Sequence, residues 1–339
     1  MKNYFYKKEK KEIIPVDDKD LNKEAKKLLG KILEDFSENI PKKFLENWDY
    51  VSLYSPSGDI SKSNAILLEV EQGAYSLKNK LNDLTGKEWT KFSCSWFIYN
   101  ALKSDLQEEK LLELGTEDHP ATYGPTMIED FIKFFTKEGE IVLDPFLGIG
   151  STLVAAKRTN RIGYGIELNK KYYEISRERL PEFRNNIFHG DAKLLDQFDI
   201  PKIDFSISSP PYWDILNRST DKFAKTRSNK NLDVNYSNNP NDLGNIENYD
   251  EFIKQLSEIY FNIHHYLKNG KYLVVIIKNV KKQGVMYPIA WDLAKELSKL
   301  YTLKDEKIWI QDKVSLAPYG YPYSWASNIL HHYCLVFQK

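Results

Sequence analysis

The chain has 339 residues, of which 42% are hydrophobic and 28% charged, a balance that excludes a mostly disordered protein. Its 48 Lys and Arg residues equal its 48 Asp and Glu residues, so a polyanion would have to meet a local basic surface, because no net charge attracts it from a distance. The two cysteines, Cys94 and Cys334, lie far apart and outside any Cys/His cluster, which excludes a disulfide scaffold and a zinc finger. Because the sequence also lacks a secretory signal and a long apolar run, we expect a cytoplasmic protein with no membrane partner.

The first third of the chain has no regular alternation of strands and helices. Residues 1–40 are rich in Lys and Glu with apolar residues at helical spacing, and residues 41–110 have a mixed pattern that indicates a helical or irregular accessory region. We therefore expect an accessory domain over 1–115, and we consider DNA recognition as its role.

From residue 116 the pattern becomes regular. Helices are predicted at 126–136, 151–158, 170–180, 249–267 (stopped by Asn269-Gly270) and 289–300. Strands are predicted at 140–144, 162–168, near 187–188, at 203–207 and 272–277, near 308 and at 333–337. Strands that alternate with helices over about 200 residues indicate a parallel or mixed sheet flanked by helices.

The first candidate site is residues 144–152 (DPFLGIGST), a predicted strand end followed by a glycine turn and a helix start. Glycines let the backbone approach a ligand closely, and the amides of a helix N-terminus face that ligand. The third glycine of a dinucleotide fingerprint and the Lys of a phosphate-binding loop are both missing. A tight structural turn is the alternative.

Two acidic residues follow at the predicted ends of the next strands. Glu167 comes 19 positions after Gly148, where an acidic side chain accepts hydrogen bonds from ribose hydroxyls in a βαβ unit. Asp191 follows the next strand, where its carboxylate would accept from the amine of adenine. The alternatives are a solvated charge or helix cap for Glu167 and an ordinary turn residue for Asp191. Together with the glycine turn, they predict a ligand that contains adenosine.

The most specific motif is residues 206–213 (SISSPPYW). Two prolines remove backbone donors and fix φ, so the Ser209 hydroxyl and nearby carbonyls are left as acceptors beside the face of Tyr212. Such a loop suits a planar ring that carries an amine. A polar turn stiffened by proline is the alternative.

These strings, with residues 164–169 (YGIELN) and 189–192 (HGDA), resemble the motifs of S-adenosylmethionine-dependent amino-methyltransferases that act on DNA. The resemblance covers about residues 116–339. It implies a Rossmann-like class I methyltransferase fold of the α/β class, with a mixed seven-stranded sheet flanked by helices. Ser-Pro-Pro-Tyr resembles the variant of the cytosine-N4 branch, whereas the adenine-N6 branch more often begins with Asp or Asn.

The resemblance also implies roles for individual residues. Glu167 would hold the ribose hydroxyls, Asp191 the adenine amine, and Thr122 or Thr126 the carboxylate of the cofactor. The other residues expected around the cofactor are Asp144, Pro145, Phe146, Gly148, Gly150, Ser151, Leu168 and Ala192. Ser209, Pro210, Pro211 and Tyr212 would hold the target base, and no metal is required.

The expected reaction is methyl transfer to the exocyclic amine of a base flipped out of double-stranded DNA. A carbon-5 mechanism needs a thiolate after proline, and neither cysteine follows one. Open alternatives are adenine-N6 methylation, guanine-N2 methylation of RNA, and an inactive nucleic-acid-binding module. A restriction endonuclease is a possible partner.

A basic stretch follows the motif. The residues expected at DNA are Trp213, Arg218, Lys222, Lys225, Arg227 and Lys230. We expect residues 214–250 to form a loop that faces DNA and contacts phosphates. A solvated loop without contacts is the alternative.

Overall fold

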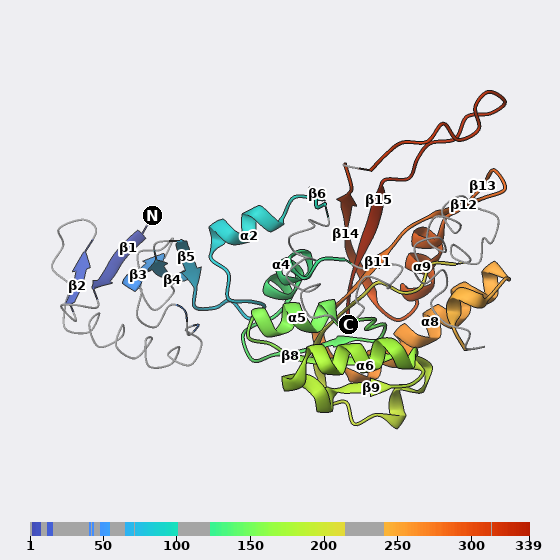
Figure 1. The fold of residues 1–339 in the computed structure, drawn as a ribbon. Coiled ribbons are helices and arrows are strands. Elements are labelled where there is room, and N and C mark those ends of the chain that lie inside the picture. The colour runs from blue at the N-terminus through green and yellow to red at the C-terminus, as the bar shows by residue number, and fades with distance from the viewer. Residues whose placement is uncertain are drawn as a thin grey trace. The chain divides into compact units, whose positions relative to one another are not determined.

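A computed structural model describes residues 2–7, 12–15, 41, 43, 48–54, 65–70, 72–100, 123–213, 241–312 and 314–339. The chain divides into two compact units, Met1–Cys94 with Thr136–Glu138, and Ser95–Phe135 with Gly139–Lys339 (Figure 1).

The first unit contains a five-stranded antiparallel sheet in the order β2-β1-β3-β4-β5. Its elements are β1 (Lys2–Lys7), β2 (Glu12–Pro15), β3 (Trp48–Tyr54), β4 (Ala65–Val70), β5 (Gly73–Ser76) and helix α2 (Gly86–Phe92). The prediction of a helical or irregular region over 41–110 was therefore wrong for β3, β4 and β5 and for a further strand at 96–98, and the helical spacing expected over 1–40 does not describe β1 and β2. Strands of four to seven residues are too short to give a clear periodic signal, and pairing with neighbouring strands decides their state.

The second unit is an α/β sheet, as the regular pattern predicted. Eight strands follow the order β6-β14-β15-β11-β10-β7-β8-β9. They are β6 (Trp96–Ile98), β7 (Ile141–Asp144), β8 (Ile162–Glu167), β9 (Ile187–His189), β10 (Ile203–Ser208), β11 (Leu267–Ile277), β14 (Thr302–Ile310) and β15 (His331–Gln338). The seven strands from β7 to β15 were expected from the sequence. The eighth, β6, comes from the predicted accessory region and pairs in parallel with β14.

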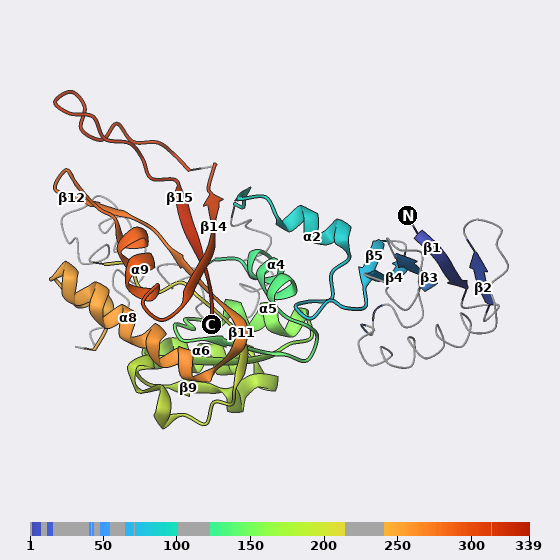
Figure 2. The same cartoon turned by 180° about the vertical axis from the view of Figure 1, so that it is seen from behind.

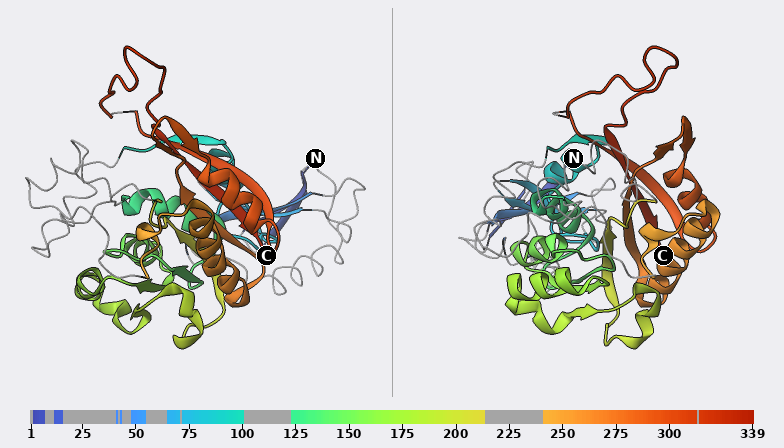
Figure 3. Two further views of the ribbon diagram at one scale, coloured as in Figure 1. Left: turned by 90° about the vertical axis from the view of Figure 1, so that its right-hand side faces the viewer. Right: turned by 45° about the vertical axis from the view of Figure 1, so that its right-hand side comes forward.

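Helices cover both faces of this sheet (Figure 3). One face carries α4 (Pro125–Phe135), α5 (Ser151–Arg158) and α6 (Lys170–Arg179), and the other carries α8 (Tyr249–Tyr266) and α9 (Ile289–Leu297). Because both faces are covered, all six residues of the central strand β10 are buried. Helix α8 ends at Tyr266, before Asn269-Gly270, which lies inside β11. None of the helices in the described ranges is long and apolar enough to cross a membrane.

The connections reverse direction in the middle of the sheet. From β7 the chain proceeds through β8 to β9 on one side, and it then crosses to β10 and β11 on the other. Strands β7 and β10 are parallel neighbours, with Phe205 opposite Val142 and Ser206 opposite Leu143. In open α/β sheets ligands bind beyond the carboxyl ends of strands at such a switch point. Both the glycine turn after β7 and the Ser-Pro-Pro-Tyr loop after β10 begin there.

We predict that Phe205→Ala destabilises the second unit by about 3–5 kcal/mol, because the ring is fully buried and stacks on Phe135 at 5.3 Å between ring centroids. Urea unfolding followed by circular dichroism measures the loss. The control, Leu303→Ala on β14, removes a side chain that is 44% exposed and should change stability by less than about 0.5 kcal/mol. Equal losses in the two variants would contradict the packing described here.

Candidate functional site

A pocket lies at the switch point, and we call it the switch-point pocket. Its lining comes from four segments that the sequence keeps apart. These are Pro145–Ile149 with Ser151 after β7, Ile166–Asn169 with Tyr172 at the end of β8, Gly190–Ala192 after β9, and Ser209 with Pro211 after β10. Tyr123, Asn241, Asp242, Leu243 and Ile259 complete the described lining. The two turns on which the functional hypothesis depends, at Gly148 and Ser209, therefore open into one cavity.

Asp144, at the end of β7, is fully buried and stabilises the glycine turn through hydrogen bonds. One carboxylate oxygen accepts from the Phe146 amide at 2.9 Å, and the other accepts from the Thr152 hydroxyl at 2.5 Å and the Tyr123 hydroxyl at 3.1 Å. Burial raises the pKa of Asp144 to about 6, and these hydrogen bonds oppose the rise. Asp144 thus orders the turn and does not itself line the pocket.

The turn has left-handed backbone at Gly148 (φ 55°) and Gly150 (φ 93°), a conformation that favours glycine. A Cβ atom at Gly150 would also lie 2.8 Å from the Leu180 side chain. The Gly148 amide points at the next strand end, where it donates to Glu167 Oε2 at 2.7 Å.

Glu167 ends β8 and lines the switch-point pocket. Its second carboxylate oxygen, Oε1, accepts from the Asn169 amide at 2.7 Å. Burial is the main cause that raises the pKa of Glu167 to about 7; the two amide hydrogen bonds lower it, and the nearby Asp144 and Asp242 raise it further. The two amides therefore fix the orientation of the carboxylate at the pocket lining.

Two more acidic residues line the pocket. Asp191 accepts from the Lys193 amide at 2.9 Å, and Asp242 accepts from the Gly244 amide at 2.9 Å. Among the described lining residues three carry carboxylates and none carries a Lys, Arg or His side chain. A pyrophosphate would find no cationic partner there, whereas a ligand with positive charge and donor groups matches the lining.

The loop after β10 forms the wall opposite Glu167. Ser209 and Pro211 line the pocket, and the Ser209 hydroxyl lies 3.3 Å from the Tyr212 hydroxyl. Ser208, the residue before Ser209, is buried, and its hydroxyl lies 2.9 Å from the Tyr260 hydroxyl. Burial raises the pKa of Tyr212, so the phenol stays protonated.

Behind Tyr212 lies a stack of rings from the last two strands. The His332 ring lies 6.0 Å from Tyr212 and stacks on Trp309 at 4.3 Å. His332 is 6% exposed, and burial lowers its pKa to about 3, so the ring is neutral. A neutral, buried ring is a fixed support for the side of Tyr212 that it faces.

The structure separates the residues expected around the cofactor into three groups. Those on the pocket lining are Pro145, Phe146, Gly148, Ser151, Glu167, Leu168, Asp191 and Ala192. Asp144, Gly150 and Thr126 lie in the described chain but not on that lining, and Thr122 lies outside the described residues.

The residues that were expected to contact the target base and the DNA also differ in where the structure places them. Ser209 and Pro211 line the pocket, while Pro210 and Tyr212 are in the same loop but not on the lining. Trp213 is 2% exposed and packs against Tyr249 and Tyr287 in the core, so it does not face DNA in this structure. Arg218, Lys222, Lys225, Arg227 and Lys230 lie outside the described residues.

Sequence reasoning missed several residues of the pocket. Tyr123 lies next to Thr122 in a segment that was expected at the cofactor, but its hydroxyl bonds Asp144 and Thr152 instead. Asp242 belongs to the stretch 214–250 that was expected to face DNA, and the described part of that stretch begins at the pocket with Asn241. A lone acidic residue in an Asn-rich stretch carries no periodic signal that could have revealed it.

We predict that Asp144 makes stability depend on pH. Its folded pKa of about 6 exceeds the ordinary 3.8, so the folded state binds the proton more tightly. The tighter proton binding of the folded state adds to the free energy of unfolding. This added stability is fully present below about pH 4, and it is lost as the pH rises through about 6, by at most about 1.4 kcal/mol per pH unit. In urea unfolding from pH 4 to 7, wild type should lose stability relative to Asp144→Asn. Parallel curves for the two proteins would contradict the buried carboxylate.

Comparisons with known proteins identify the family of the chain. The family model of the N6- and N4-methyltransferases, described as DNA methylase, matches residues 3–178, more than half of the chain. The match contains the glycine turn and Glu167 and ends before the Ser209 loop.

Curated relatives match over shorter stretches. The Type II methyltransferase M.BglII of Bacillus subtilis is 42% identical over 83 residues, 24% of this chain and 22% of that protein. M.HindIII of Haemophilus influenzae is 43% identical over 100 residues, 28% of this chain and 32% of that protein. The chain thus spans between a fifth and a third of the length of these relatives.

Among solved structures, TrmN from Thermus thermophilus is 15% identical with a TM-score of 0.43, over 67% of this chain and 52% of that one. The family match, which extends over more than half of the sequence, is the finding that classifies the protein. The chain belongs to the N6/N4 family of DNA methylases, whose methyl donor is S-adenosylmethionine.

Proposed function

We propose that this chain transfers a methyl group from S-adenosylmethionine to the exocyclic amine of a base in double-stranded DNA, with cytosine N4 as the target. The observation that carries the proposal is that the Gly148 turn, Glu167 and Ser209 line one pocket. A donor held by the first two would lie next to an acceptor held by the third. Transfer between neighbouring ligands needs this proximity.

The switch-point pocket fits the cofactor. Glu167 would accept from the ribose hydroxyls and Asp191 from the adenine amine, while Phe146, Leu168 and Ala192 provide apolar surface for the ring. Asp242 adds a third carboxylate, which suits a ligand that carries a sulfonium and an ammonium group. When bound, the cofactor supplies an electrophilic methyl group on its sulfonium sulfur.

The loop after β10 would prepare the acceptor. An exocyclic amine is a poor nucleophile because its lone pair is delocalised into the ring. The Ser209 hydroxyl and the Pro210 carbonyl accept hydrogen bonds from the two N–H groups of this amine. These hydrogen bonds let the nitrogen lone pair turn toward the methyl donor. Pro210 and Pro211 have no amide hydrogens, so the backbone there offers the amine no competing donor. The face of Tyr212 stacks on the flipped base and offsets part of the cost of unstacking it.

The choice of cytosine over adenine rests on Ser209, because Ser-Pro-Pro-Tyr resembles the cytosine-N4 branch of the family. Adenine N6 is the alternative target, since the two amines present the same geometry to the loop.

We further propose the division of labour along the chain. Residues 116–339 would form the methyltransferase domain and residues 1–115 an accessory region for recognition. The described sheet adds β6, at Trp96–Ile98, to the catalytic unit, which favours a boundary near residue 95. The basic residues of 214–231 would contact phosphates. A cognate restriction endonuclease is a proposed partner, since several relatives are named Type II methyltransferases, and we propose that the protein acts in the cytoplasm.

We predict that DNA from cells that express the protein contains N4-methylcytosine, measured by mass spectrometry of its nucleosides. The matched control is Gly148→Asp, which adds a carboxylate beside Glu167 and should abolish the product. N6-methyladenine in its place would contradict the cytosine assignment but not the transfer. DNA without any methylated amine would contradict the proposed function.

We predict that Tyr212→Ala lowers kcat by about 100-fold or more, because the base loses the surface that positions it. Binding of S-adenosylmethionine, measured by calorimetry, should change by no more than about twofold, since Tyr212 is not on the pocket lining. Tyr212→Phe keeps the ring and loses only the contact with Ser209, so it should cost no more than about tenfold. Full turnover by the Ala variant would refute the stacking role.

A further inference from the structure

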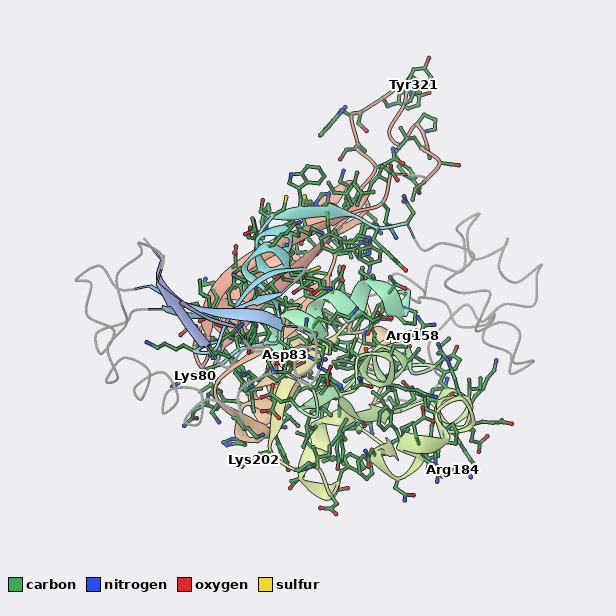
Figure 4. All side chains as sticks on the ribbon, turned by 90° about the vertical axis from the view of Figure 1, so that its left-hand side faces the viewer. Lys80, Asp83, Arg158, Arg184, Lys202 and Tyr321 are labelled. Carbon is green, nitrogen blue, oxygen red and sulfur yellow. The ribbon has the colours of Figure 1, made fainter. Side chains whose placement is uncertain are left out.

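A long connection between β14 and β15 projects beyond the sheet of the second unit, beside the hairpin of β12 (Val280–Lys282) and β13 (Val285–Tyr287) (Figures 1 and 2). We call residues 314–329 the aromatic arm. Four of its rings are exposed, Tyr319 by 60%, Tyr321 by 81%, Tyr323 by 94% and Trp325 by 88%. Figure 4 places Tyr321 at the far end of the arm.

The aromatic arm has a defined structure of its own. Asn328 bridges its two sides, accepting from the Ala317 amide at 3.0 Å and donating to the Ala317 carbonyl at 2.8 Å. At the tip the amides of Tyr323 and Ser324 donate to the Gly320 carbonyl at 2.8 and 2.7 Å. The rings are thus presented on an ordered backbone, which lowers the entropy cost of binding through them.

The arm begins next to the base loop. Its two stems are the end of β14 and the start of β15, closed by the bond from the Gln311 amide to the Leu330 carbonyl at 2.9 Å. Trp309 in one stem stacks on His332 in the other, and His332 faces Tyr212. The stems of the arm therefore carry the two rings, Trp309 and His332, that lie behind Tyr212 in the proposed base site.

The aromatic arm itself carries no charged residue, Asp312 lies at its foot, and its basic neighbours come from the β12–β13 hairpin. Residues 313–339 contain no Asp or Glu, and the β12–β13 hairpin adds Lys281 and Lys282 without an acidic residue. The Lys281 ammonium lies 5.7 Å from the Trp325 ring centroid and donates to the Ser327 carbonyl at 2.9 Å. In a chain with no net charge, exposed rings with a basic border match a polyanion that carries flat, apolar bases.

We infer that the aromatic arm binds DNA by stacking Tyr321, Tyr323 and Trp325 on bases beside the nucleotide that is flipped into the site. This inference rests on the proposed function and deepens it, because it names a DNA-binding element other than the basic 214–231 stretch. Stacked rings would occupy the space next to the extruded base and stabilise the opened duplex. Because stacking involves no phosphate, its contribution to affinity does not depend on salt.

The test compares wild type with the triple variant Tyr321→Ala, Tyr323→Ala, Trp325→Ala. Binding to a duplex of random sequence and to a duplex that carries the site methylated in expressing cells, both labelled with fluorescein, is measured by anisotropy over a range of salt concentrations, and methyl transfer is measured on unmodified plasmid DNA. The triple variant should raise Kd by about tenfold or more, with an unchanged slope of log Kd against log salt. Binding of S-adenosylmethionine should stay at the wild-type value.

The matched control is Trp291→Ala, which removes a tryptophan of helix α9 that is 54% exposed and lies outside the arm. It should bind DNA as wild type does. Wild-type DNA affinity in the triple variant would overturn the inference. The inference would also be overturned if the triple variant lost self-association in sedimentation but bound DNA as wild type does. That result would mean that the arm binds a second copy of the chain.

The two proposals fail in different ways. If wild type binds DNA without transferring a methyl group, the proposed function is contradicted and the comparison of affinities still decides the role of the arm. If wild type transfers methyl groups and the triple variant binds and methylates equally well, only the inference about the arm is wrong.

Discussion

The site depends on the parallel pairing of β7 with β10. The two strands are 62 residues apart at their first positions, and they are neighbours only because the chain turns back across the sheet after β9. Parallel neighbours end at the same edge, so the loops that follow them must diverge to opposite faces or enclose a space between them. Here Gly148 and Ser209 enclose that space. The proposed meeting of methyl donor and amine follows from this one topological feature.

Buried carboxylates then give the pocket its chemistry. Asp144 uses its oxygens to hold Tyr123, Thr152 and the Phe146 amide, so it fixes the shape of the turn. Glu167 is held by two amides and still faces the cavity. Burial away from water raises the pKa of both groups, and the nearby Asp144 and Asp242 raise that of Glu167 further. A bound ligand with donor groups and positive charge would relieve part of the cost of this burial.

The wall on the other side of the site is built from rings, and it extends outward. Tyr212 rests beside His332, His332 stacks on Trp309, and the strands that carry the last two continue into the aromatic arm. The loop proposed to bind the base and the arm proposed to stack on DNA therefore share one support. A change in the position of His332 would therefore affect both the loop and the arm.

Much of the catalytic unit could be predicted from sequence. Helix α5 has the predicted bounds, and the other helices of that unit end within a few residues of theirs, because apolar periodicity and the flanking turn residues are local signals. The first unit could not be predicted in this way, since its strands are short and β1 pairs with β3, more than 40 residues away in the chain. The eighth strand, β6, is only three residues long and is defined by its pairing with β14.

The sequence by itself pointed to the segments that line the pocket, because glycines, an acid at a fixed spacing and a Ser-Pro-Pro-Tyr string are local patterns. Only the tertiary structure decided how deeply each residue is buried and whether it lies on the pocket lining. Asp144 lies beneath the pocket and Glu167 on it, Trp213 is in the core, and Asp242 joins the lining from a stretch assigned to DNA. Which side of a turn a side chain faces depends on what packs against that turn, and those neighbours come from strands and helices far away in the chain.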